Sequence, residues 1–217
     1  MKKITNKAII LFLIVFVTMG LSACSADNGG VIDETSVTSD QLEAPDYIYI
    51  QGRRLNTELT ELRLARADLT DADIIPLRYM TNLTWLELVN NQISDLTPLA
   101  GLMSLDILFL GGNQISDLTP LAGLTNLTEL FLGGNQISDI TPLAELTNLT
   151  RLWLGNNQIN DLTPLEGLTN LTDLRLFANQ ISDLTPLAGL TNLTWLHLAY
   201  NPITDWSPVA HVENVFD

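Results

Sequence analysis

The sequence predicts a solenoid, in which short structural units stack along one axis and each unit contacts only its neighbours. The first observation is a 22-residue unit that recurs six times, over 83–104, 105–126, 127–148, 149–170, 171–192 and 193–214. The second is its leucine spacing, close to L-T-x-L-x-L-x-x-N-Q-I-S-D-L-T-P-L-A-G-L-T-N in every copy. The third is an apolar content of 46%, enough for a continuous core. This period and spacing are typical of a curved solenoid, or horseshoe.

Residues 1–23 are expected to be a secretory signal rather than part of the fold. Lys2 and Lys3 precede an apolar run over 8–23. That run is shorter than the ~20 residues of a typical membrane-spanning helix, although a retained membrane helix is the alternative. The residues L-S-A-C over 21–24 closely resemble the bacterial lipoprotein signal. The resemblance implies cleavage before Cys24 and lipid attachment to its sulfur, which would anchor the chain to a membrane.

Residues 24–44 are expected to form a flexible tether behind that lipid anchor, because they are polar and show no apolar periodicity. The charge of the chain beyond residue 23 is strongly negative, with seven arginines and no lysine against 25 acidic residues, a net charge of −18. Such a body repels nucleic acid at a distance, so a role in nucleic-acid binding is disfavoured.

Residues 45–82 are expected to contain an N-terminal cap and a degenerate first repeat. Apolar and polar character alternates over 47–50 and Gly52 follows, which predicts a capping strand or hairpin. The unit over 59–82 is longer than the regular ones, with Ala67 in place of the recurring asparagine. At the other end, residues 215–217 are interpreted as a short tail. Either Trp206 and Phe216 fold over the end of the solenoid or this end pairs with another molecule.

Each regular unit, over 83–214, is expected to contain one short strand and one short helix. Leucines at positions 4 and 6 alternate with outward residues, which predicts the strand. The asparagine at position 9 and the aspartate at position 13 recur in all six units, and both are interpreted as local caps of backbone groups. The threonine before each proline, as in Thr97-Pro98, is predicted to cap a 3₁₀ or single-turn helix on the convex side.

The whole unit resembles the 22-residue leucine-rich repeat of the bacterial internalins, and the resemblance covers residues 59–214. It implies a right-handed leucine-rich repeat solenoid with a parallel β-sheet on the concave face and short 3₁₀ or loop segments on the convex face. It also implies a non-enzymatic role in binding proteins. The sequence departs from many internalins because it shows no immunoglobulin-like region or cell-wall sorting signal after the repeats.

The outward strand positions collect seven of the eight aromatic residues of the six regular units. Phe109, Phe131 and Trp153 follow one another at position 5, and glycine pairs at positions 7 and 8 leave a trough beside them. An apolar centre with a charged border is typical of a binding patch. Alternatively, the rings only stabilise the sheet. The predicted ligand-binding residues are Trp85, Glu87, Ile107, Phe109, Glu129, Phe131, Arg151, Trp153, Asp173, Arg175, Phe177, Trp195, His197 and Tyr200.

The sequence contains no motif of an enzyme, a metal site or a cofactor site, and its only histidines are His197 and His211. The expected function is recognition of a protein or peptide by a lipid-anchored extracytoplasmic chain. A carbohydrate binder and a module that self-associates through its C-terminal end are the alternatives. If the rings face solvent, replacing Phe131 and Trp153 with serine removes binding and lowers the melting temperature only slightly.

Overall fold

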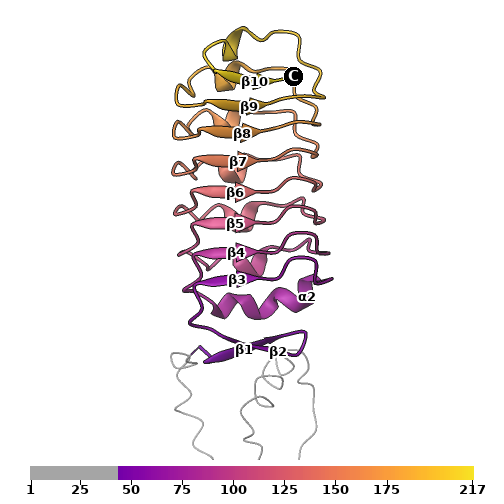
Figure 1. Cartoon of the computed structure of the whole chain (residues 1–217), viewed down its shortest axis with the longest axis vertical. Helices are drawn as coiled ribbons and strands as arrows, with labels where there is room; N and C mark the ends of the chain where they lie inside the picture. The colour runs from indigo at the N-terminus through magenta and orange to yellow at the C-terminus, as the bar shows by residue number, and fades with distance from the viewer. Residues whose placement is uncertain (1–43) are drawn as a thin grey trace, which may run out of the picture. The chain divides into compact units, whose positions relative to one another are not determined.

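The computed structural model describes residues 44–217, which form a column of stacked coils (Figure 1). One side of the column is a parallel sheet with the strand order β10-β9-β8-β7-β6-β5-β4-β3. Its strands are β3 (Glu61–Arg63), β4 (Trp85–Glu87), β5 (Ile107–Phe109), β6 (Glu129–Phe131), β7 (Arg151–Trp153), β8 (Asp173–Arg175), β9 (Trp195–His197) and β10 (Asn214–Phe216). This arrangement confirms the predicted leucine-rich repeat solenoid.

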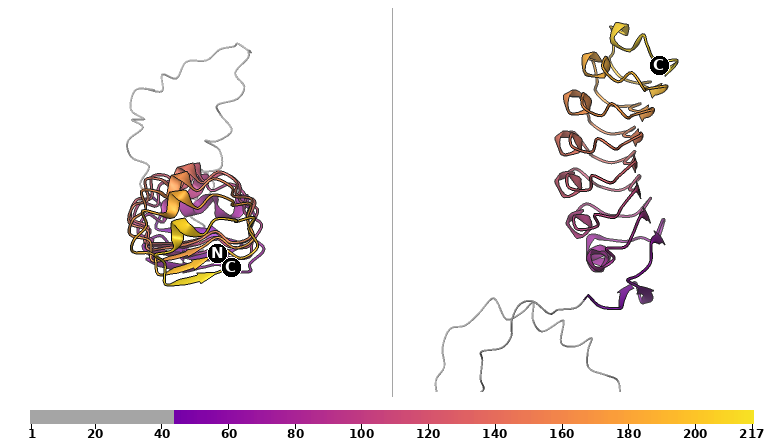
Figure 2. Two further views of the ribbon diagram at one scale, coloured as in Figure 1. Left: turned by 90° about the horizontal axis from the view of Figure 1, so that it is seen from above. Right: turned by 90° about the vertical axis from the view of Figure 1, so that its left-hand side faces the viewer.

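The other side of each regular coil carries a 3₁₀ helix, as Figure 2 shows in its side view. These helices are η2 (Thr97–Leu99), η3 (Thr119–Leu121), η4 (Thr141–Leu143), η5 (Thr163–Leu165), η6 (Thr185–Leu187) and η7 (Ser207–Val209). The proline at the second position of each helix fixes its own φ and lacks an amide proton that would need a partner there. Three residues make one turn, so the predicted short 3₁₀ segments are confirmed.

An antiparallel hairpin precedes the repeats, formed by β1 (Tyr47–Ile50) and β2 (Arg53–Asn56). Gln51 and Gly52 connect the strands with φ values of 46° and 78°, the left-handed geometry of a two-residue hairpin turn. The first coil then contains a helix that the sequence interpretation did not include, α2 (Asp71–Ile74), which continues into η1 (Ile75–Tyr79). The carboxylate of Asp73 starts this helix by accepting hydrogen bonds from the amide and hydroxyl of Thr70, at 2.9 and 2.7 Å.

The core between the sheet and the 3₁₀ helices is a single continuous cluster of leucine and isoleucine side chains. Leu108, Leu130 and Leu152, at the centre of consecutive strands, are each 0% exposed. Because side chains alternate across a strand, the residues on either side of each leucine face away from this core. One repeat cannot cover its own leucines, so the coils depend on their neighbours for burial.

An asparagine ladder joins each coil to the next at the end of the strand, as the sequence predicts. The amide nitrogen of Asn113 donates to the carbonyls of Leu88 and Leu110, both at 2.9 Å, and its oxygen accepts from the amide of Ile93 at 3.1 Å. Donation to two carbonyls in the same way recurs at Asn91, Asn135, Asn157, Asn179 and Asn201. The ladder therefore satisfies backbone groups that would otherwise be buried without partners.

The aspartate of each repeat, and not the threonine, caps the 3₁₀ helix. The carboxylate of Asp95 accepts from the amide of Thr97 at 2.8 Å, and the same bond forms at Asp117, Asp139, Asp161, Asp183 and Asp205. Thr97 is the first residue of η2 rather than the residue before it. The prediction of a threonine cap is therefore wrong. In the Asp-x-Thr turn the carboxylate of the aspartate reaches the backbone amide two residues later, which is the amide at the start of the helix. The capping role predicted for the aspartates is confirmed.

This capping predicts an acid-sensitive stability. Hydrogen bonds from the hydroxyl and amide of Thr119 lower the pKa of Asp117, and equivalent bonds lower the pKa of Asp139, Asp161 and Asp183. A carboxyl group with a lowered pKa in the folded state stabilises it above the unfolded pKa, about 3.9, and loses this effect as the pH falls through the folded value. We expect the urea midpoint to fall steadily below about pH 4.

A triple variant, D117N/D139N/D161N, tests this expectation, because asparagine keeps an oxygen that accepts the amide hydrogen bond but does not titrate. Its urea midpoint is expected to fall less steeply below about pH 4 than that of the unmodified protein. An unchanged acid dependence in the variant would show that other carboxyl groups cause the loss.

The last coil is shorter than the sequence interpretation has it. Asn214 pairs with Trp195, and Phe216 pairs with His197. The corresponding pair of the regular coil before them, Asp173 and Trp195, is separated by more residues of sequence. Residues 214–216 are therefore the edge strand β10 rather than the end of a repeat followed by a tail at 215–217. The shortening brings the ring of Phe216 onto the sheet face, where it stacks on Trp195 with 5.5 Å between ring centres.

Candidate binding surface on the sheet

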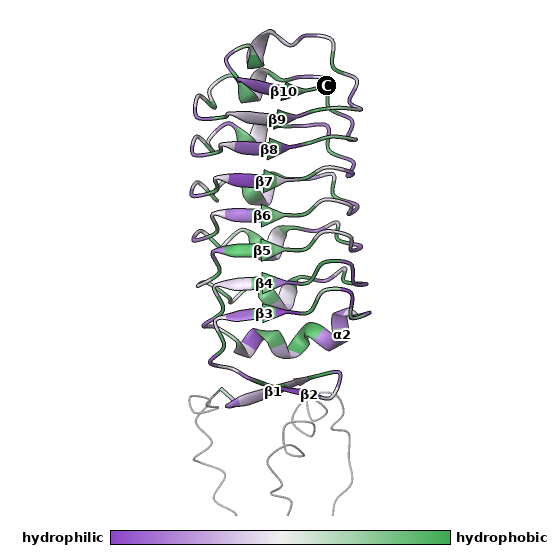
Figure 3. Cartoon of the chain, viewed as in Figure 1, coloured by the Kyte–Doolittle hydropathy of each residue, from purple (hydrophilic) through white to green (hydrophobic). Residues whose placement is uncertain are grey.

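The predicted site residues from β4 to β9 lie on the outer face of the sheet, at strand positions that alternate with the buried leucines. Parallel pairing without a register shift sets Phe109 beside Phe131 and Phe131 beside Trp153. Figure 3 shows β5 as apolar along its whole length, whereas β6, β7 and β8 begin with polar residues. The apolar centre of the face therefore lies at β5 and at the last residues of β6 and β7, which are Phe131 and Trp153.

The rings at this centre stack on one another in an aromatic row, defined here as Trp85, Phe109, Phe131 and Trp153. The ring centres of Phe109 and Phe131 lie 4.3 Å apart with planes only 4° from parallel. Trp153 meets Phe131 edge to face at 4.6 Å, and Trp85 lies 5.3 Å from Phe109. The row is thus continuous over four coils.

An arginine covers each end of the aromatic row. The guanidinium carbon of Arg63 lies 4.6 Å from the ring centre of Trp85, and that of Arg175 lies 3.6 Å from Trp153. Both distances are within the range of a cation–π contact. The predicted site residues include Arg175 but not Arg63. The contact of Arg63 with Trp85 was missed because it joins different strand positions of neighbouring repeats.

The burial of Phe131 differs from the prediction that these rings face solvent. Only 8% of Phe131 is exposed, although it lies outside the leucine core. Its neighbours in the row cover its faces. Phe109 and Trp153 are half-buried for the same reason. The ring edges, rather than the ring faces, are what this part of the surface offers to a partner.

An apolar trough lies beside the aromatic row, with a volume of about 540 Å³. Its floor is formed by glycines of three successive coils, and its walls by the ring edges and by residues of the flanking coils. The complete lining is Val89, Asn90, Phe109, Gly111, Gly112, Phe131, Gly133, Gly134, Trp153, Gly155, Asn156, Arg175 and Phe177. The trough beside the rings that the glycine pairs predict is therefore present.

Phe177 closes the trough by lying directly over Gly155. A Cβ atom at Gly155 would fall 2.2 Å from Cε1 of Phe177, so only glycine leaves space for this ring. Gly112 is required for a different reason, because its φ is +69° and a Cβ there would meet the side-chain oxygen of Asn90 at 2.2 Å. The glycine pattern thus has both a packing cause and a backbone cause.

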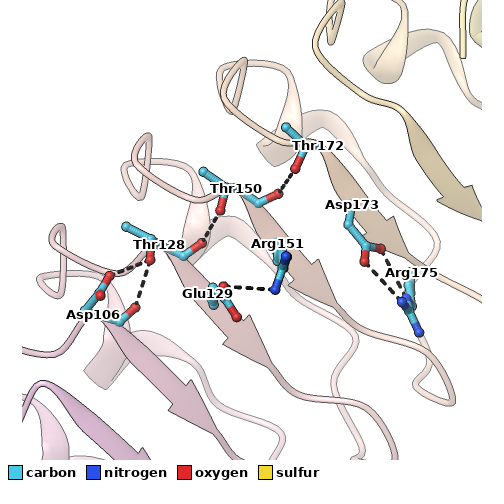
Figure 4. A network of polar contacts seen from close by, with 8 residues as sticks. All are labelled: Asp106, Thr128, Glu129, Thr150, Arg151, Thr172, Asp173 and Arg175. Atoms are coloured by element: carbon cyan, nitrogen blue, oxygen red, sulfur yellow. Dashed lines mark hydrogen bonds and ion pairs between the residues drawn. The ribbon is translucent and has the colours of Figure 1, made fainter.

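Four of the charged residues that border the aromatic row form two ion pairs (Figure 4). Arg151 contacts Glu129 at 3.1 Å, and Arg175 binds Asp173 through two nitrogens at 3.1 Å each. Threonines of successive coils form a separate ladder at the start of the strands, in which the hydroxyl of Thr150 donates to the carbonyl of Thr128. The centre of the sheet face is therefore close to electrically neutral, in a body that carries many unpaired carboxylates.

A second hollow of about 250 Å³ lies next to the trough and is lined by Asp173, Arg175, Trp195, Leu196, His197 and Phe216. Arg175 lines both hollows. Trp195 is 49% exposed and Phe216 is 46% exposed, so both present large apolar surfaces to solvent. The predicted site did not include Phe216. Val212 and Val215 have the same spacing as the first two core leucines of a regular unit, and this spacing could have indicated another strand.

The remaining predicted site residues lie outside both hollows. Trp85, Ile107, Glu129 and Arg151 lie on the same face, Glu87 follows Leu86 in β4, and Tyr200 lies in the loop after β9 with 85% of its surface exposed. Cys24, the predicted lipidation site, lies outside the described residues. Within residues 44–217, no cluster of three His, Cys, Asp or Glu side chains could hold a metal ion. No helix in this range has the length and apolar character needed to span a membrane.

Comparison with known proteins relates this architecture to solved structures. A family model described as Leucine Rich repeats (2 copies) matches five overlapping segments over residues 81–211. An internalin (inlF) of Listeria monocytogenes is 44% identical with a TM-score of 0.65, over 67% of this chain and 44% of that chain. Internalin C2 (inlC2) of the same species is 43% identical with a TM-score of 0.63, over 76% of this chain and 83% of that chain.

A leucine-rich repeat protein of Leptospira interrogans is 31% identical with a TM-score of 0.61, over 65% of this chain and 38% of that chain. No curated protein matches. The chain thus spans less than half of two of these three structures and most of the internalin C2 structure. The repeat match covers more than half of the chain, and on both grounds the chain belongs to the leucine-rich repeat family and is internalin-like.

Proposed function

We propose that this chain is a non-enzymatic binding protein that recognises a protein partner on the face of its β-sheet. The observation that carries the proposal is the apolar trough beside the aromatic row, open to solvent at the centre of the sheet. Exposed apolar surface with a polar border is characteristic of interfaces between proteins. The likeness to internalins supports the same class of function.

The distribution of charge supports this choice of face. Residues 44–217 contain 20 acidic residues and seven arginines, so most of the surface repels acidic proteins. At the centre of the sheet face the charges form the pairs Glu129–Arg151 and Asp173–Arg175. The trough itself is lined by no acidic residue. A partner therefore meets less repulsion at this face than elsewhere.

A carbohydrate ligand fits this geometry less well. Sugar rings stack on the open faces of aromatic side chains, as the sequence interpretation supposed. Here Phe109 and Phe131 cover each other's faces at 4.3 Å, and Arg175 lies over one face of Trp153 at 3.6 Å. Trp195 has one face covered by Phe216, so Tyr200, which is 85% exposed, is the strongest remaining candidate for such stacking. Self-association through the edge of β10 is the other alternative, since β10 pairs only with β9 among the described strands.

We also propose an extracytoplasmic location, with a lipid on Cys24 as the membrane anchor. The proposal rests on the basic start, the apolar run and the L-S-A-C sequence before the body. The tether expected over 24–44 lies outside the described residues except for its last residue, Ala44.

A pull-down from cell-envelope extract with two double variants tests the proposed binding face. Val89 and Trp195 lie at opposite ends of the two hollows, and replacing both with serine removes apolar contacts without touching the aromatic row. We expect capture of the partner to fall at least about tenfold, since exposed tryptophans at interfaces are often binding hot spots.

The matched control replaces Ile75 and Met103 with serine, two side chains that are 46% and 50% exposed and lie off the sheet face. The control should capture the partner like the unmodified protein. Equal capture by both double variants would contradict the proposal. Loss of binding to glycans on an array, with protein capture unchanged, would favour the carbohydrate alternative. If light scattering detects dimers that form through the edge of β10, self-association would be favoured.

A further inference from the structure

The trough ends beside two hydrogen-bond donors that have no acceptor among residues 44–217. The indole nitrogen of Trp153 is completely covered and has no partner. Arg175 uses its Nε and Nη2 atoms to donate to the carboxylate of Asp173, which leaves Nη1 without a hydrogen bond. The guanidinium carbon lies 3.6 Å from the indole ring centre, so the two donors belong to one cluster. A buried donor without an acceptor costs free energy that an acceptor from a ligand would recover.

The floor of the trough offers mainly apolar contact, because two of its amides are already paired. The amide of Gly112 donates to the carbonyl of Gly133 at 2.8 Å, and the amide of Gly134 donates to the carbonyl of Gly155 at 2.9 Å. Strand addition takes place at a free sheet edge, whereas the trough lies within the repeats and away from such an edge. A ligand is therefore held on the floor mainly by its apolar side chains.

The dimensions suit a short extended piece of chain. Three successive coils provide the floor, and strands of a sheet are about 4.8 Å apart, so the floor is roughly 10 Å long. An extended chain rises about 3.3 Å per residue, which places about three residues along this length. The volume of about 540 Å³ lies within the range of small ligand sites.

We propose that the trough binds an extended segment of the partner protein in which apolar side chains lie on the glycine floor and an adjacent Asp or Glu side chain accepts hydrogen bonds from Arg175 and Trp153. This inference rests on the proposed function and specifies the chemistry of the recognised segment. A guanidinium group has two edges, and Asp173 occupies only one of them (Figure 4). The side chain of Arg175 is 39% exposed, and its guanidinium carbon lies 3.6 Å from the ring centre of Trp153, so a carboxylate that binds Arg175 arrives at the same cluster. The proposal requires a side-chain rotation on binding that exposes the indole nitrogen.

The charge around the cluster favours an acidic ligand group. Arg175 is the only charged residue that lines the trough. Its carboxylate partner, Asp173, lines the neighbouring hollow instead. A partner carboxylate would therefore meet one cation and one indole donor at the end of an otherwise neutral trough. A partner lysine or arginine would find no carboxylate in the lining of the trough.

Heteronuclear NMR of the labelled protein with short blocked peptides tests the inference. The probes are acetylated and amidated Leu-Val-Glu, its Leu-Val-Gln counterpart, and acetylated Leu-Val with a free terminal carboxylate. The indole resonance of Trp153 reports on the donor cluster, and the amide resonance of Gly133 reports on the floor. We expect saturable shifts of both at millimolar Leu-Val-Glu, and binding about fivefold to tenfold weaker for Leu-Val-Gln.

Variants at two arginines complete the experiment. Arg175→Gln should make the two blocked peptides bind equally, and Arg175→Lys should retain part of the preference because it keeps the charge. Arg151→Gln, at an arginine of the same face that lines neither hollow, should leave the preference unchanged. Circular dichroism melts of each variant confirm that it is folded.

Three results with the two blocked peptides would overturn the inference. These are equal binding of the two blocked peptides to the unmodified protein, a preference for Leu-Val-Glu that survives Arg175→Gln, and the absence of any shift at millimolar peptide. Binding of only the peptide with the free terminus would also overturn it, because the acid would then be a chain end rather than a side chain. If both blocked peptides shift Gly133 equally, recognition of proteins at this face still stands while its acidic specificity fails.

Discussion

Replacing Asn113 with alanine is expected to lower the free energy of unfolding by about 4 kcal/mol, a large part of the stability of a typical domain. The side chain is only 8% exposed and makes three hydrogen bonds to backbone groups, to the amide of Ile93 and the carbonyls of Leu88 and Leu110. Alanine would leave the amide of Ile93 without a partner and would remove one of the two hydrogen bonds to each carbonyl, since Leu88 keeps its bond from Asn91 and Leu110 keeps its bond from Asn135. The unpaired amide costs about 1–3 kcal/mol, and each lost hydrogen bond costs about 1 kcal/mol.

A second asparagine of the repeat provides the control for this prediction. Asn126 is exposed and makes one hydrogen bond, from its amide nitrogen to the carbonyl of Met103 at 2.8 Å. Asn126→Ala should cost less than about 1 kcal/mol, because water can replace that bond. Urea unfolding followed by circular dichroism measures both variants. Similar losses in the two variants would mean that the position of an asparagine in the coil does not decide its effect.

The repetitive part of the fold could be predicted because each repeat imposes the same contacts on the next. Leucines at fixed positions, the asparagine ladder and the 3₁₀ helices all follow from local residue preferences that recur in every regular unit. The elements that break the period could not be predicted in the same way. The helix α2 forms where the longer first unit carries Thr70 and Asp73, and β10 forms where the last coil is shortened.

The candidate surface shows the same division. Strand alternation predicts that Phe109, Phe131 and Trp153 lie outside the leucine core, and they do. Their rotamers are not fixed by that alternation, so the sequence could not show that the rings cover one another. The contact of Arg63 with Trp85 joins different positions of adjacent coils, and that of Arg175 with Trp153 places a guanidinium group over the ring of its direct cross-strand neighbour. Such contacts depend on side-chain directions that a pattern of residue types does not contain.

The aromatic row changes what is expected of Phe131. Phe131→Ala should lower the free energy of unfolding by about 3 kcal/mol, because a nearly buried ring is removed. The ring is 8% exposed and stacks on Phe109 at 4.3 Å while meeting Trp153 at 4.6 Å. Each aromatic pair adds about 0.5–1.5 kcal/mol beyond the burial of area. The burial of Phe131 therefore replaces the small loss of stability expected from a ring that faces solvent with a larger expected loss.

Trp195→Ala is the matched comparison, since it removes a larger ring from the same sheet face at a site that is 49% exposed. Its loss should be about 1 kcal/mol, because less area leaves water and its stack on Phe216 has more distant centres, at 5.5 Å. Urea unfolding of both variants measures the difference. If Phe131→Ala costs no more than Trp195→Ala, the row does not hold the coils together and its rings are kept for the partner alone. If Phe131→Ala costs more than Trp195→Ala, the row supports both the sheet and the trough. A loss of binding in a Phe131 variant can then be assigned to a missing contact only after its stability has been measured.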